Sequence, residues 1–201
     1  MLFKKGTPYT DYNICLLLYI IFSKVLFYNY PSKILESYIN LLIPISFINS
    51  NAILVTSQLI TLFDPLIFDK YRLIKGERKN RKISYGAMLF CHYLIHHVPV
   101  IITYKFMEQN NFYMSHGYYT GLVSLSVQLI WFIFSTYDYN CDSIYMPIKK
   151  DVKKLLWIFN VLTHLLCGIN PYISLVILSE MTILFGLSIF KKNYVNLIYH
   201  F

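Results

Sequence analysis

Three histidines lie within one apolar segment of the 201-residue chain, MLFCHYLIHHVPVIITYKF. On a helix, His92 and His96 lie one turn apart on the same face, and His97 follows directly in the chain. An imidazole can serve as a general base, as a nucleophile toward an acyl group or as a metal ligand, because its pKa lies near neutrality. The type and spacing of these three residues therefore predict a candidate catalytic or metal-binding site.

Three interpretations of the histidines remain open from their spacing. In the first, each ring is structural and hydrogen-bonds a neighbouring helix, although three rings so close together need many partners away from water. In the second they bind metal, because H-x-x-x-H-H is similar to the histidine boxes of membrane desaturases and hydroxylases. Those di-iron sites need several boxes, whereas the other histidines are scattered, at His116, His164 and His200, so we expect no metal. In the third, an imidazole is the nucleophile and general base for an acyl group.

Other polar residues recur inside apolar segments, where an unpaired polar group is costly unless it faces the protein interior. Gln58, Thr61 and Asp64 follow one another at helical spacing in TSQLITLFDPL and are expected to form one stripe. Taken singly, such a residue is more often a hydrogen-bonding contact between helices. Taken together, we expect them to line one polar tunnel with residues of two later segments, namely Ser124, Gln128, Asn160, Thr163 and His164.

The segments that must position these residues have the composition of a membrane protein. The chain is 56% hydrophobic and only 14% charged, and crossing a bilayer core about 30 Å thick takes roughly 20 apolar residues per helix. Apolar runs predict membrane-spanning helices near 14–30, 40–63, 83–107, 117–137, 154–170 and 172–190. Because these would use most of the chain, we expect an all-α polytopic membrane protein with a single domain over residues 1–201.

Three of the predicted spans have unusual boundaries. The first follows Lys4 and Lys5 without a small-residue cleavage site, so we expect it to remain as an anchor. The last two are separated only by Asn170 and Pro171, where a proline favours a tight hairpin because it cannot continue a helix. The fifth span is short, so one kinked helix is the alternative.

The basic residues predict the orientation of the chain. Lys and Arg are retained on the cytosolic side during membrane insertion. With six spans, all but three of the 18 basic residues fall in even-numbered loops or at the termini; the exceptions are Lys24, Lys33 and Lys105. We therefore place both termini in the cytosol. The net charge of +8 is explained by this topology, and nucleic acid binding is not expected because no reader motif accompanies the basic residues.

Four segments carry variants of a known motif series in the order of that series. SQLITLFDP keeps Ser57 and Asp64 of the pattern S-K-x-x-E-x-x-D-T, and HYLIHHVPVI keeps His96 and His97 of an H-x-x-H-H box. SLSVQLIWFIF and KKLLWIFNVLTHLLCG are similar to the third and fourth motifs. From Ser57 to Gly168, the chain thus resembles the ELO family of very-long-chain fatty acid elongases.

The resemblance implies an enzyme of the endoplasmic reticulum membrane that condenses an acyl-CoA with malonyl-CoA to give a 3-ketoacyl-CoA, within a bundle of six or seven helices around an acyl tunnel. It implies that His96 attacks the thioester while His97 and His92 orient groups or move protons. No bound cofactor is implied. Expected partners are membrane lipids, other enzymes of the elongation cycle and a second copy of the chain. Substrate contacts are expected at Gln58, Asp64, Tyr93, Gln128 and His164, with the CoA phosphates near the basic loop 70–82.

Several motif positions depart from the family pattern. Gln58 stands in place of lysine, Thr61 of glutamate, Pro65 of threonine, Tyr93 of the first histidine of the box, and Gln128 of a later histidine. These substitutions leave two further possibilities. One is a non-catalytic relative that binds lipid or acts as an interaction subunit. The other is a different histidine-dependent hydrolase or acyltransferase of membrane lipids.

Overall fold

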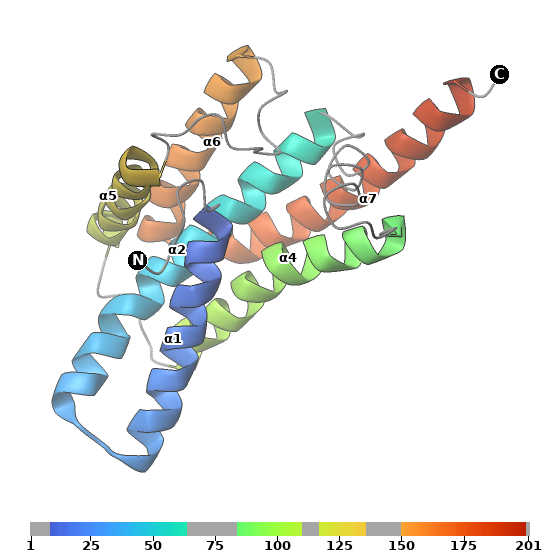
Figure 1. The fold of residues 1–201 in the computed structure, drawn as a ribbon. Coiled ribbons are helices and arrows are strands. Elements are labelled where there is room, and N and C mark those ends of the chain that lie inside the picture. The colour runs from blue at the N-terminus through green and yellow to red at the C-terminus, as the bar shows by residue number, and fades with distance from the viewer. Residues whose placement is uncertain (1–8, 64–83, 110–116, 136–149, 200–201) are drawn as a thin grey trace.

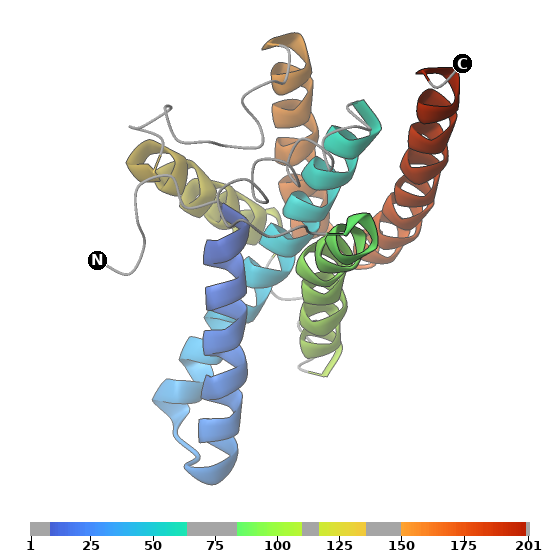
Figure 2. The same ribbon diagram turned by 45° about the vertical axis from the view of Figure 1, so that its right-hand side comes forward.

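The computed structural model describes residues 9–63, 84–109, 117–135 and 150–199, and these ranges consist of helices and short turns. The helices match the predicted apolar segments in order and position, so the all-α expectation is confirmed. Figures 1 and 2 show successive helices running in alternating directions. The helices are α1 (Tyr9–Asn29), α2 (Lys33–Phe63), α4 (Tyr85–Gln109), α5 (Gly117–Ser135), α6 (Lys150–Ile169) and α7 (Ile173–Tyr199).

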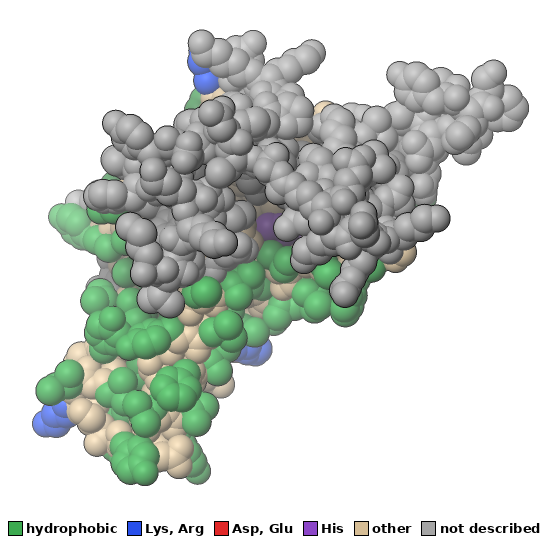
Figure 3. All heavy atoms as spheres, viewed as in Figure 1, with side chains coloured by type: hydrophobic (Ala, Val, Ile, Leu, Met, Phe, Trp, Pro, Cys, Tyr) green, Lys and Arg blue, Asp and Glu red, His purple; other side chains and the backbone are tan. Residues whose placement is uncertain are grey.

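Three of these helices are long and apolar enough to cross a bilayer. The qualifying stretches are Tyr12–Asn29 in α1, the whole of α2, and Ile173–Phe190 in α7. Shorter apolar stretches occupy Tyr119–Ile130 in α5 and Lys154–Ile169 in α6. Hydrophobic side chains cover much of the described surface in Figure 3, as expected for a protein in contact with lipid.

The longest helix, α2, is the centre of the fold and packs against each of the other described helices. Its 31 residues rise about 46 Å, which is more than the thickness of a bilayer core. Nearly every residue from Ile43 to Thr61 is buried. Because many of these are polar, α2 offers hydrogen-bonding groups to several neighbours at once.

Two apolar clusters hold α1, α4, α6 and α7 to α2. One joins Phe47 of α2 to Ile20 of α1 and Met107 of α4. The other lies near the carboxyl end of α2, where Leu59 packs in a cluster that also receives Phe185 of α7. The second cluster also includes Leu89, about one turn before His92 on α4, so α2 and α7 pack beside the part of α4 that carries the histidines.

The chain between α6 and α7 forms a hairpin, which excludes the alternative of one kinked helix. α6 ends at Ile169 and α7 begins at Ile173. The backbone N–H of Tyr172 donates to Asn170 Oδ1 at 3.0 Å, and the N–H of Ile173 donates to the Asn170 carbonyl oxygen at 3.1 Å. The asparagine therefore stabilises the turn into α7, while Pro171 prevents continuation of α6.

Candidate functional site

The histidine cluster, defined as His92, His96 and His97, lies on the side of α4 that faces α2 and α7. His97 is fully buried, while His92 and His96 are partly buried. The ring centroids of His92 and His96 are 4.4 Å apart, as predicted for residues one turn apart on a helix. Ser84 Oγ accepts a hydrogen bond from the N–H of Ala87 at 3.1 Å and so caps the start of this helix.

Gln58 of α2 contacts the cluster directly. Its Nε2 lies 2.9 Å from Nε2 of His92. Because an amide nitrogen can only donate, His92 Nε2 is the acceptor and the neutral ring carries its proton on Nδ1. Thr61 Oγ1 donates to the Gln58 backbone oxygen at 2.8 Å and lies 3.5 Å from Gln58 Oε1. The predicted helical spacing of Gln58 and Thr61 therefore corresponds to a side of α2 that contacts His92.

His97 lies between two aromatic rings. Tyr93, one turn earlier on α4, stacks on it with a centroid distance of 4.6 Å and an interplanar angle of 18°. Phe185 of α7 lies 5.7 Å from the His97 ring, and it also stacks on His92 at 5.4 Å. We did not predict Phe185 from the sequence. The available signal was its spacing with Ile177 and Met181, which marks the inward face of α7.

The cluster retains hydrogen-bonding groups that no described residue satisfies. His96 Nδ1 and both ring nitrogens of His97 are buried and lack a partner within the described part of the chain. Leaving a buried polar group unpaired costs about 1–3 kcal/mol, so an apolar side chain would pack at lower cost. The arrangement therefore offers nitrogen donors or acceptors, in a dry setting, to a bound polar group.

A second buried polar group lies where α2 meets α5 and α6. His164 Nδ1 lies 2.8 Å from the backbone oxygen of Asn160, and its Nε2 lies 3.4 Å from Asn49 Oδ1. Ser124 Oγ donates to the same Asn49 oxygen at 2.8 Å. A Cβ atom on Gly121 would collide with the His164 backbone oxygen. The glycine thus lets α5 approach α6 closely enough for this network, which we call the Asn49 network (Asn49, Ser124, Asn160 and His164), to form.

The two polar groups project from opposite faces of α2, which bears on the expectation of one polar tunnel. Asn49 and Gln58 are nine residues apart in α2, or about two and a half helical turns. They therefore point in opposite directions, Asn49 toward α5 and α6 and Gln58 toward α4. Our prediction of a single tunnel lined by all the buried polar residues does not fit this geometry.

The predicted substrate-contacting residues are accordingly divided. Gln58 and Tyr93 contact the histidine cluster, whereas His164 belongs to the Asn49 network. Gln128 is buried one turn beyond Ser124 on α5, and its Oε1 has no partner among the described residues. Asp64, His116 and the basic loop 70–82 lie outside the described residues.

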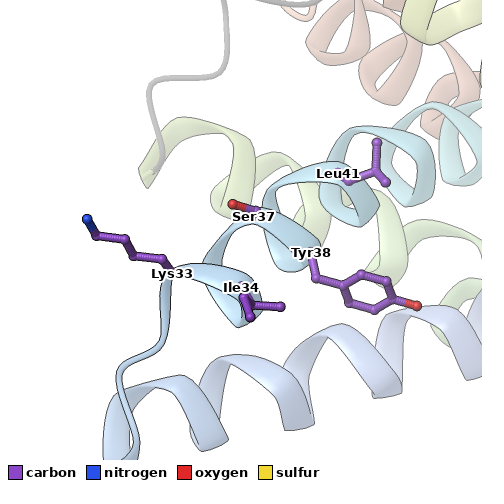
Figure 4. Close-up of a pocket in the computed structure, with 5 residues that line it drawn as sticks. All are labelled: Lys33, Ile34, Ser37, Tyr38 and Leu41. Carbon is purple, nitrogen blue, oxygen red and sulfur yellow. The ribbon is translucent and has the colours of Figure 1, made fainter.

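No described group of His, Cys, Asp or Glu side chains is arranged to hold a metal ion. The surface pocket in Figure 4 is lined by Lys33, Ile34, Ser37, Tyr38 and Leu41, all from the first turns of α2. This pocket is open and far along α2 from Gln58, so it is separate from the histidine cluster. Comparisons of the chain with protein-family models, with curated proteins and with solved structures find no match.

Proposed function

We propose that this protein is a fatty acid elongase of the condensing type, in which His96 forms an acyl intermediate and His97 and His92 assist it. The observation that carries the proposal is the buried cluster of three imidazoles with ring nitrogens left unpaired by every described residue. A buried polar group without a partner is retained against its cost where it has a ligand to bind. The resemblance of the surrounding motifs to ELO elongases supplies the ligand class.

The proposed chemistry begins with the lone pair of a His96 ring nitrogen attacking the thioester carbonyl carbon of an acyl-CoA. The carbon–sulfur bond breaks, CoA leaves as a thiolate that takes up a proton, and the acyl group is held as an acyl-imidazole. Malonyl-CoA then loses carbon dioxide, and the resulting carbanion attacks the same carbonyl carbon. The carbon–nitrogen bond breaks, which releases 3-ketoacyl-CoA and restores His96.

The proposed setting is the endoplasmic reticulum membrane, which the chain crosses six times with both termini in the cytosol. Alternating helix directions support this topology, as does the position of the three exceptional lysines. Lys24 near the end of α1 lies 4.3 Å over the ring of Phe106 near the end of α4. Lys33 begins α2 beside that end of α1 (Figures 1 and 2). These lysines therefore gather on the side that the charge distribution assigns to the lumen.

The test is chain extension by the purified protein in lipid nanodiscs, supplied with acyl-CoA and labelled malonyl-CoA. We expect labelled 3-ketoacyl-CoA from the wild type and a loss of about 100-fold or more in His96→Ala, as for removal of a catalytic imidazole. Cys91→Ala, at an exposed neighbour on α4, is the matched control and should retain activity. Full activity in His96→Ala would remove this residue from the mechanism.

A second candidate function is lipid binding without catalysis. It is favoured by Gln58, because an amide contacts His92 at the position where the family motif has a lysine. Such a protein would bind acyl-CoA in the same nanodiscs but form no product from either substrate. Release of free fatty acid without malonyl-CoA would instead indicate a histidine-dependent hydrolase.

A further inference from the structure

α7 has two apolar faces, and the bundle uses only one of them. Its inward stripe comprises Ile177, Met181 and Phe185, which pack against the cluster around α2. Ser174 and Ser188 continue this stripe and are both buried. The spacing of about one residue per turn is that of a helix packed along one side. The inward stripe alone therefore accounts for the packing of α7 in the monomer, and the opposite face of the helix is not needed for it.

The other face carries a second stripe with the spacing of a helix-packing seam. Its members follow each other at alternating intervals of four and three residues, which is the repeat of the a and d positions of a coiled coil. We define this outer seam as Val176, Glu180, Ile183, Leu187 and Phe190. Each is exposed, with the apolar members between 52% and 75% exposed. The described bundle leaves this seam uncovered.

Glu180 makes the outer seam unlike an ordinary lipid-facing surface. It lies near the middle of the apolar stretch Ile173–Phe190, which has the highest mean hydropathy of the three candidate spans, 2.1. Its side chain is exposed, and no described residue gives its carboxyl a hydrogen bond or an ion pair. Ionisable groups at this depth almost always face protein or water, because lipid cannot satisfy them.

We propose that the outer seam is the contact surface for a second copy of this chain, with the two α7 helices parallel and Glu180 paired with its counterpart. Two copies inserted in the same orientation present Glu180 at the same depth, so a two-fold axis along the membrane normal brings the carboxyls together. One carboxyl in its protonated form donates to the other. A single polar position in an otherwise apolar seam fixes both the register and the number of helices.

Small residues beside the seam support the close approach that this pairing needs. Gly186 has nothing within 4 Å of the position of a Cβ atom, and Ser179 is exposed with its hydroxyl already donating to the Val176 carbonyl oxygen at 2.9 Å. Small residues at a membrane helix interface let backbones approach and pack. The seam also lies on the side of α7 away from Phe185, so a dimer formed through the seam makes no contact with the histidine cluster.

The experiment uses the full-length protein in liposomes, with a photo-crosslinking amino acid placed at Ile183 in one preparation and at Leu94 in another. Leu94 is an exposed residue of α4 and is the matched control for lipid-facing position. We expect a crosslinked homodimer from Ile183 and none from Leu94. Dilution into excess lipid, followed by single-molecule photobleaching, gives the dimer dissociation constant.

We expect Glu180→Ala to raise this dissociation constant about tenfold, because it removes a hydrogen bond within the membrane. Glu180→Gln should keep the dimer, since two amides can also pair, and Glu108→Ala at an exposed carboxylate outside the seam should not change it. A monomeric wild type, a crosslink from Ile183 to a different protein, or a dimer indifferent to Glu180→Ala would each overturn the proposal. None of these outcomes depends on elongase activity.

Discussion

Two fully buried histidines on different helices around α2 have opposite hydrogen-bonding states. His164 has an oxygen within reach of each ring nitrogen, the Asn160 backbone oxygen at 2.8 Å and Asn49 Oδ1 at 3.4 Å. The neutral ring carries one N–H, and the shorter distance assigns it to the bond with the Asn160 oxygen. His97 has none at either nitrogen within the described residues. The same residue type, equally buried, therefore joins helices in one region and keeps unused hydrogen-bonding capacity in the other.

The contrast arises from what each helix finds opposite it. On the α6 side, α2 presents Asn49, and α5 adds Ser124 to the same amide. On the α4 side, Gln58 contacts His92, and the aromatic rings of Tyr93 and Phe185 lie against His97. Aromatic rings hold an imidazole in place without satisfying its nitrogens. The Asn49 network also keeps two buried atoms without a partner among the described residues, Asn49 Nδ2 and Asn160 Oδ1, so the contrast is between the two imidazoles. We conclude that the His164 ring joins α6 to α2 and that the histidine cluster is the place to look for a bound ligand.

The largest expected effect comes from closing the space that the Asn49 network needs. Gly121→Val places side-chain atoms against the backbone of α6, which cannot move aside as a flexible side chain does. We expect the free energy of unfolding, measured by SDS titration in bicelles, to fall by about 3 kcal/mol. Gly86→Val, at a glycine with open space around it, is the control. Equal losses in the two variants would mean that the approach of α5 to α6 is not limiting.

Removing the satisfied imidazole should cost somewhat less. His164→Leu leaves the Asn49 and Asn160 polar groups with fewer partners in a buried setting, so we expect the free energy of unfolding to fall by about 2 kcal/mol. The same SDS titration measures it. Unchanged stability would show that the Asn49 network makes no net contribution to the free energy of unfolding. His164 would then have no structural role to set against that of His97.

Removing the unsatisfied imidazole should have the opposite sign. His97→Leu deletes two unpaired nitrogens and keeps an apolar side chain among Tyr93 and Phe185, so we expect a gain of about 1 kcal/mol in the free energy of unfolding. The elongase proposal adds that chain extension falls in the same variant, as when a functional group is kept at the expense of stability. A loss of stability as large as that of His164→Leu would show that His97 is also structural.

The sequence was sufficient to predict the helices but not the direction of each polar side chain. Runs of apolar residues located every described helix, and Asn170 with Pro171 located the hairpin. The contact of Gln58 with His92 agrees with two patterns in the sequence. These are the helical spacing of Gln58 with Thr61 and the grouping of three histidines within one apolar segment. Asn49 was missed although it stands in a visibly polar run with Ser50 and Asn51, because only the rotation of α2 against α6 reveals which of these residues meets a neighbouring helix. That rotation is set by packing between distant segments, which local spacing does not encode.

The smallest expected effect concerns the hydrogen bond between Gln58 of α2 and His92 of the histidine cluster. In the wild type the Gln58 amide donates to His92 Nε2 at 2.9 Å, so nitrogen NMR of the protein in bilayers should show His92 with its proton on Nδ1. Gln58→Glu replaces the donor with an acceptor, and the carboxylate should draw the proton to Nε2. Gln58→Met removes the bond and should lower the free energy of unfolding by about 1 kcal/mol.

The same substitutions distinguish two roles for Gln58, setting the tautomer of His92 and filling space beside it. If Gln58 acts only by filling space, Gln58→Met and Gln58→Glu should leave the tautomer of His92 as it is in the wild type. If Gln58 sets the tautomer, the two variants should differ in their nitrogen spectra while His164, on the opposite face of α2, keeps its wild-type signal. The ring centroid of His96 lies 4.4 Å from that of His92. A shift of the His92 proton from one ring nitrogen to the other would therefore alter the immediate surroundings of His96, the proposed nucleophile.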